Sequence, residues 1–120
     1  MSDLKPKATT IQLGDKEYGL LFTINAIDEI QDKFDCPISE IGELMQDYKK
    51  TFKIVRFLLT VLINEAIDDA ERGEAHVDER FIGRKLTPDN ISSMKIKVFS
   101  SFKSGLPASE ETESPNVKSE

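Results

Sequence analysis

Few side chains in this chain of 120 residues could do chemistry: it has one histidine, one cysteine and scattered carboxylates. His76 could act as a general base and Cys36 as a nucleophile, but neither lies in a local motif that would orient it for catalysis. We expect His76 to be a solvated surface residue, because the residues around it are polar. We expect Cys36 to fill space at a helix junction. The sequence therefore predicts a protein that is not an enzyme, with no catalytic residue.

The carboxylates do not predict a metal site. Asp28, Glu29 and Asp32 recur at helical spacing, and Asp68 and Asp69 are adjacent, which is typical of solvated helix faces. The sequence contains no cysteine–histidine cluster and no calcium-loop spacing. A glycine-rich phosphate-binding loop after a strand is missing as well. We expect neither a metal ion nor another cofactor.

The first elements that could position a functional surface are predicted by residues 11–34, IQLGDKEYGLLFTINAIDEIQDKF. Apolar residues alternate on both sides of Gly14 and Asp15, which is typical of a tight β-hairpin whose turn requires a positive φ. From residue 24 onward the apolar period becomes that of a helix, with Ile30 and Phe34 on one face. This segment predicts packing and partner contacts rather than catalysis.

The run LGDKEYGLLFTINAIDEIQDKF resembles the opening of the tail assembly chaperones of long-tailed bacteriophages. The resemblance implies a small acidic protein in which a short hairpin precedes a helical body. It also implies binding to the tape-measure protein, a long helical polypeptide that sets tail length. In that family the chaperone keeps this polypeptide soluble until tail-tube subunits polymerise around it and displace the chaperone. Such a protein works in the host cytoplasm and is absent from the mature virion.

The rest of the chain predicts further helices. Pro37 ends the first helix, because proline disfavours a helical conformation in the residue before it. Gly73 is expected to close the longest helix, and Thr87 with Pro88 to begin the last one. The expected segments are a short helix at 38–48, a long helix at 51–71, a helical turn near 78–83 and a last helix at 87–103. The predicted fold class is α+β, mostly α: an N-terminal β-hairpin followed by a small bundle of about four to five helices.

A single hairpin-plus-helical domain is expected at residues 9–105, between two disordered ends. Residues 1–8 are polar and contain a proline, and residues 106–120 form an acidic tail rich in Pro, Ser and Glu with little to bury. The opening MSDLKPKATT lacks the apolar core of a secretory signal, so we expect a cytoplasmic protein. The longest strongly apolar stretch is far shorter than the ~20 residues needed to cross a bilayer.

The overall charge argues against two classes of partner. A net charge of −6 and a pI of about 4.9 disfavour nucleic acid and anionic membranes, which both attract cationic surfaces. The span 84–103 is nevertheless locally basic, which leaves open a DNA-binding regulator that uses the last helix. The more common explanation is that lysine stems cover an apolar seam. Another possibility is that this basic patch meets an acidic face on a second copy.

The feature of the sequence that indicates a function is a second apolar stripe on each of the two main helices. Besides its broad face, the 51–71 helix has a narrow apolar stripe, and the last helix has another. Two interpretations stay open: the stripes are enclosed in the core, or they bind a helical polypeptide such as the tape-measure protein. The second interpretation also predicts self-association, and a small structural virion component such as a head–tail connector is the alternative function. The candidate partner-binding residues are Ile54, Phe57, Val61, Ile96 and Phe99.

Overall fold

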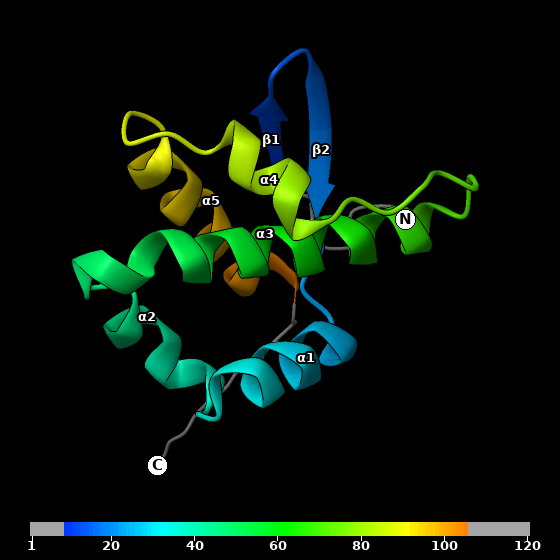
Figure 1. Ribbon diagram of the computed structural model, residues 1–120. Helices are drawn as coiled ribbons and strands as arrows, with labels where there is room; N and C mark the ends of the chain where they lie inside the picture. The colour runs from blue at the N-terminus through cyan, green and yellow to red at the C-terminus, as the bar shows by residue number, and fades with distance from the viewer. Residues whose placement is uncertain (1–8, 106–120) are drawn as a thin grey trace.

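The computed structural model describes residues 9–105 and confirms the α+β, mostly helical fold (Figure 1). The elements in chain order are β1 (Thr9–Leu13), β2 (Lys16–Leu20), α1 (Ile24–Phe34), the 3₁₀ turn η2 (Ile38–Glu40), α2 (Ile41–Leu44), α3 (Tyr48–Ala70), α4 (Glu79–Lys85) and α5 (Ile91–Gly105). The two ends expected to be disordered, 1–8 and 106–120, lie outside the described residues.

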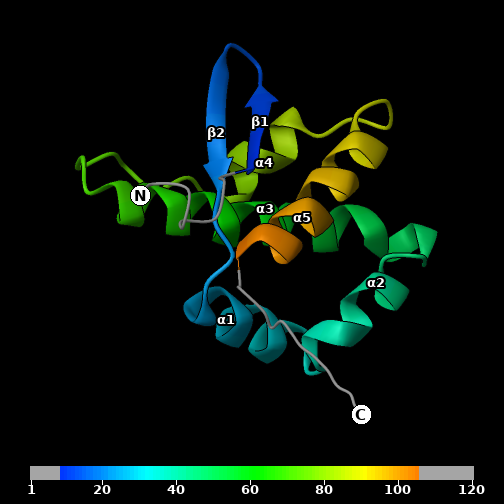
Figure 2. The ribbon, with the colours of Figure 1, turned by 180° about the vertical axis from the view of Figure 1, so that it is seen from behind.

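The hairpin forms as the sequence predicts. β1 and β2 pair antiparallel, with Ile11 opposite Tyr18, and Gly14 adopts a φ of 63° in the turn. A two-stranded ribbon is only marginally stable alone, so it needs support from the helices. β2 lies against α3 and β1 lies beside α5 (Figure 2). The backbone N–H of Leu21 donates to the carbonyl of Leu62 on α3 at 3.1 Å, which joins the end of the hairpin to the middle of the long helix.

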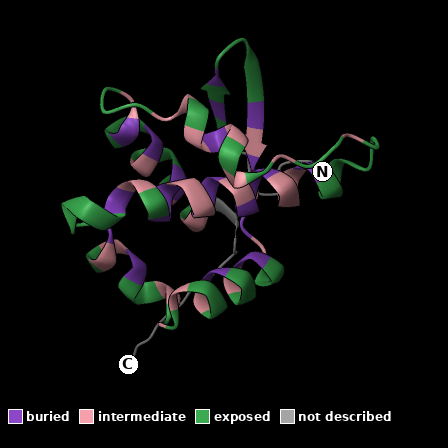
Figure 3. Cartoon of the chain, viewed as in Figure 1, coloured by how far each residue is buried: buried purple, intermediate pink, exposed green. Residues whose placement is uncertain are grey.

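α3 is the centre of the fold. The hairpin and α4 lie on one side of it, α1 and α2 on the other, and α5 crosses behind it (Figures 1 and 2). Buried residues recur along α3, whereas the exposed ones are concentrated at its two ends (Figure 3). The buried residues of α3 are Thr51, Ile54, Val55, Leu58, Leu59, Val61, Leu62, Ile63 and Ile67.

Two of the predicted helix boundaries are wrong around α3. The helix expected at 38–48 is instead split into η2 and the short α2, and α3 begins at Tyr48. Asp47 sets this start, because its Oδ1 accepts a hydrogen bond from the backbone N–H of Lys49 at 2.9 Å. α3 ends at Ala70, three residues before Gly73, because Glu71 adopts the left-handed conformation at φ 54°.

α5 begins at Ile91 rather than at 87, although Thr87 is the cap that the sequence predicts. The Oγ1 of Thr87 accepts a hydrogen bond from the backbone N–H of Asn90 at 3.1 Å. In return, the Oδ1 of Asn90 accepts one from the backbone N–H of Thr87 at 2.8 Å. This reciprocal pair is a capping box, and it stabilises a turn that leads into α5.

The segment between α3 and α4 is fastened to α3 by Asn64. Its Oδ1 accepts from the backbone N–H of Val77 at 2.8 Å, and its Nδ2 donates to the carbonyl of the same residue at 3.0 Å. Lys16 also bonds Glu74, which connects the hairpin to this segment. That hydrogen bond raises the pKa of Lys16 and lowers the pKa of Glu74. The contacts hold a segment without regular structure in place.

We expect Asn64→Ala to lower the free energy of unfolding by about 1–3 kcal/mol, because both backbone polar groups of Val77 would lose their partner. Chemical denaturation measures this loss, and amide hydrogen exchange should be faster at Val77. Asn25→Ala, at an exposed position of α1, is the matched control and should change stability by no more than about 0.5 kcal/mol. Equal stability of the two variants would contradict the role of Asn64.

Candidate partner-binding surface

The residues that could do chemistry are not gathered into a site. Within residues 9–105, no group of three or more His, Cys, Asp and Glu side chains could hold a metal ion. His76 lies on the surface with its Nε2 at 2.8 Å from Oδ1 of Asp68, which is also exposed. Burial raises the pKa of the half-buried Cys36 thiol, and the charges of Glu40 and Asp35 add to this. A raised pKa keeps the thiol protonated and makes it a weaker nucleophile.

Two of the five predicted partner-binding residues belong to the core. Ile54 is 2 % exposed and Val61 is 6 % exposed. Both lie on the same stripe of α3 as Phe57, which contacts α1, so that helix covers this side of α3. The prediction that Ile54 and Val61 contact a partner is therefore wrong, because an enclosed side chain cannot contact another molecule while the fold stays intact.

Phe57 is half-buried at the contact between α3 and α1. Its ring meets the ring of Phe34 edge-to-face, with centroids 5.5 Å apart and planes at 88°. The ammonium group of Lys33 lies 5.4 Å from the Phe57 centroid and covers the ring from the solvent side. Phe57 therefore joins two helices of the same molecule and adds little open apolar surface.

Ile96 and Phe99 lie where a partner could reach them. They help to line a hollow of about 360 Å³ between α2 and α5, which we call the α2–α5 groove. Ile96 is 69 % exposed, while Phe99 is half-buried and packs edge-to-face against Phe102. The other lining residues are Gly42, Met45, Gln46, Ser92 and Lys95.

The sequence reasoning missed the α2 wall of this groove. Gly42 lies next to the ring of Phe99, at a distance that a Cβ atom would turn into an ordinary van der Waals contact. A Cβ atom at this position would lie 3.6 Å from Cζ of Phe99. Met45 is 2 % exposed and adds apolar surface next to it. A glycine inside a predicted helix often marks such a close approach, and this was the available signal.

The chain segments on the two sides of the groove differ in charge, although Lys95 is the one charged residue among those that line it. Residues 24–47, which include α1 and α2, contain seven carboxylates and one lysine, whereas α5 contains three lysines and no carboxylate. The lysines do not form one cationic stripe, because Lys95 lines the α2–α5 groove and Lys97 lines a different hollow on the opposite flank of α5. These two lysines therefore lie on different flanks of α5.

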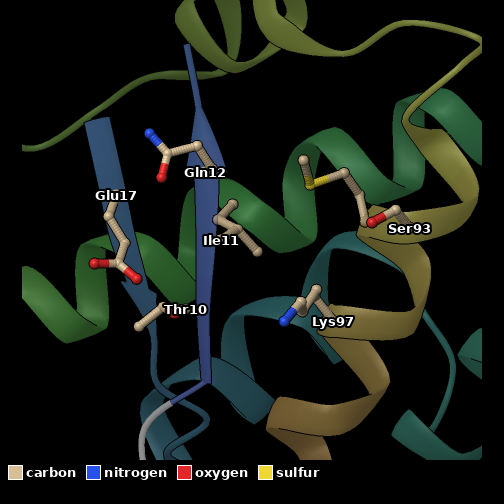
Figure 4. Close-up of a pocket in the computed structure, with 7 residues that line it drawn as sticks. Thr10, Ile11, Gln12, Glu17, Ser93 and Lys97 are labelled. Carbon is tan, nitrogen blue, oxygen red and sulfur yellow. The ribbon is translucent and has the colours of Figure 1, made fainter. Parts of the chain in front are cut away.

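That second hollow lies between β1 and α5 and measures about 330 Å³. Figure 4 shows Lys97 and Ser93 of α5 on one side of it, and Ile11 and Gln12 of β1 on the other. Thr10 and Glu17 complete its polar side, and Met94 also lines it. The apolar residues that line this hollow, Ile11 and Met94, are both buried, whereas the α2–α5 groove is lined by the exposed Ile96, so we assign the candidate partner-binding surface to that groove.

Comparison with protein-family models, with curated proteins and with solved structures finds no match to this chain. None of the helices within residues 9–105 has the length and apolar character needed to span a bilayer.

Alanine substitutions of two isoleucines test which of them belongs to the core. Ile54→Ala should lower the free energy of unfolding by about 2–5 kcal/mol, because it removes enclosed methyl groups and leaves a cavity. Ile96→Ala should change it by no more than about 0.5 kcal/mol, since this side chain is largely solvated. Thermal or denaturant unfolding of both variants measures the difference. A larger loss for Ile96→Ala than for Ile54→Ala would contradict the assignment.

Proposed function

We propose that this protein is a non-enzymatic assembly chaperone for the tails of long-tailed bacteriophages, which binds the tape-measure protein and keeps it soluble. The observation that supports this best is the α2–α5 groove, where Ile96 and Phe99 offer apolar surface outside the core. The opening hairpin and helix, which resemble those of the chaperone family, agree with it. The proposal requires a protein that grips another polypeptide rather than one that converts a substrate.

The groove suits an amphipathic helix. Such helices bind in apolar grooves through residues at i, i+3, i+4 and i+7, which form one stripe. Phe99 would contact this stripe at the bottom of the groove and Ile96 at the rim, while the buried Met45 supports the bottom from within. Lys95, which lines the groove, favours a client with an acidic residue beside its apolar stripe.

The acidic surface supports the solubilising role. Several copies bound along one client would cover its apolar stripes and present carboxylates to the solvent, which keeps the complex soluble. In this proposal the protein acts in the host cytoplasm and self-associates on its client. It leaves when tail-tube subunits replace it, so it is absent from the mature virion.

Co-expression with the tape-measure protein tests the proposal. We expect the wild-type chain to keep this client soluble and Ile96→Asp to lose at least about tenfold in affinity, because a carboxylate would face the client's apolar stripe. Ile24→Asp is the matched control, since Ile24 is 64 % exposed on α1 and does not line the groove. Soluble client is measured after centrifugation, and circular dichroism checks that both variants are folded.

Equal activity of the two variants would exclude the groove as the client site. Failure of the wild-type chain to solubilise the tape-measure protein would exclude the function. Mass spectrometry of purified particles gives an independent test, because a chaperone should be missing from them. A stoichiometric amount of the protein in finished particles would favour the structural virion component instead.

A further inference from the structure

Three exposed residues form a line along α5 and the turn before it. Asp89, Ile96 and Lys103 are seven residues apart, a spacing that returns to nearly the same side of a helix. Asp89 precedes the first residue of α5, but its turn continues the helical path, because the backbone N–H of Ile91 donates to the carbonyl of Thr87. Each step of seven residues covers about 10 Å along the axis. We call this line the α5 stripe.

The α5 stripe is complementary to itself. If two copies of α5 lie antiparallel about a two-fold axis at Ile96, each residue lies opposite the residue equally far on the other side of position 96. Ile96 then meets Ile96 of the second copy, and Lys103 meets Asp89 at both ends. The contact between the two isoleucines thus lies between two ion pairs, each formed by Lys103 of one copy and Asp89 of the other. Such a self-complementary pattern suits an interface between identical surfaces.

All three side chains of the α5 stripe are exposed within residues 9–105. Ile96 is one of three large apolar side chains that are exposed among residues 9–105. Within that part of the chain, neither Asp89 nor Lys103 forms an ion pair, although four other pairs are formed. The neighbours on this face include the short side chains Ser92 and Ser93, which let a second helix approach closely. The exposed apolar and ionic groups therefore coincide on one line.

The other charges of α5 do not add to this complementarity, because by the same rule Lys95 of one copy lies at the level of Lys97 of the second copy, and both are lysines. Lys95 and Lys97 lie on the two flanks of the helix, in separate hollows, and point away from the stripe. The net charge of −6 repels two copies at long range, but charges more than about 8 Å apart are largely screened at physiological salt. Contacts along the stripe lie within this distance.

We propose that the protein forms a two-fold dimer through antiparallel pairing of the α5 stripe. A single pair of helices buries less surface than the roughly 1,600 Å² of a typical stable complex, so the dimer dissociates on dilution. This inference goes beyond the proposed function and does not rest on it. Ile96 also lines the α2–α5 groove, so a copy paired in this way cannot use Ile96 for a client at the same time.

Charge reversal tests the pairing in the absence of any client. Asp89→Lys places two lysines opposite each other at both ends, and Lys103→Glu does the same with two carboxylates. Each single variant should weaken the dimer by about tenfold or more, because two attractions become repulsions. The double variant restores opposite charges and should dimerise like the wild type. Sedimentation velocity over a range of concentrations measures the dissociation constant.

Two control reversals change the net charge equally at exposed sites outside the α5 stripe: Asp28→Lys on α1 and Lys49→Glu on α3. Both should leave the dissociation constant unchanged within about twofold. A wild-type chain that stays monomeric up to millimolar concentration would overturn the inference. So would a dimer insensitive to the single reversals, or a double variant that fails to recover. Asp89 does not line the α2–α5 groove, so the Asp89→Lys variant should still bind the client. Client binding by this variant therefore tests the proposed function, and its dissociation constant as a dimer tests the pairing.

Discussion

The apolar residues of α3 must be covered on several sides at once, and the other elements are arranged around that requirement. The helix is 23 residues long and buries side chains along most of its length. A single neighbouring helix can cover only one stripe, so the hairpin, α1, α4 and α5 each take a different part. Removing any one of them would expose part of α3, and the fold should therefore be strongly cooperative.

This arrangement decides where apolar surface remains for other molecules. α3 is enclosed, so its second stripe is used within the molecule. α5 lies at the edge of the bundle, where its buried face holds residues such as Val98 and its outer face is left to solvent. Ile96 stands where the groove and the α5 stripe meet. Binding of a client there and pairing of two copies would therefore compete, and the concentration of each partner would set the outcome.

The sequence predicts the local elements well. The hairpin is recognisable because Gly14 supplies the positive φ of its turn. α1 ends at Phe34, because Asp35 adopts a left-handed φ of 54° two residues before Pro37. Thr87 was also recognised as a cap. The end of α3 was predicted to within one residue, although the left-handed Glu71 closes the helix instead of Gly73, whereas its start at Tyr48 lies three residues before the predicted one.

The functional surface could be predicted only in part. Periodicity shows that Ile54, Val61 and Ile96 belong to apolar stripes, but it does not show which stripe another element will cover. Coverage depends on contacts between residues far apart in the sequence. The α2 wall of the groove depends on such a contact, between Gly42 and Phe99, which lie on different elements. Ile96 is exposed, whereas Phe99 is half-buried and lies next to Gly42 of α2.

The support of the hairpin by distant residues has a consequence for biosynthesis. The hairpin lies near the start of the chain, yet it rests on α3, bonds the carbonyl of Leu62 and lies beside α5. A ribosome releases the two strands long before it has made the helices that stabilise them. During translation the two strands therefore stay unpaired, or pair only transiently, until the helices that support them have been made. A nascent chain that stalls before α5 can already pack β2 against α3, but β1 would lack the helix that lies beside it.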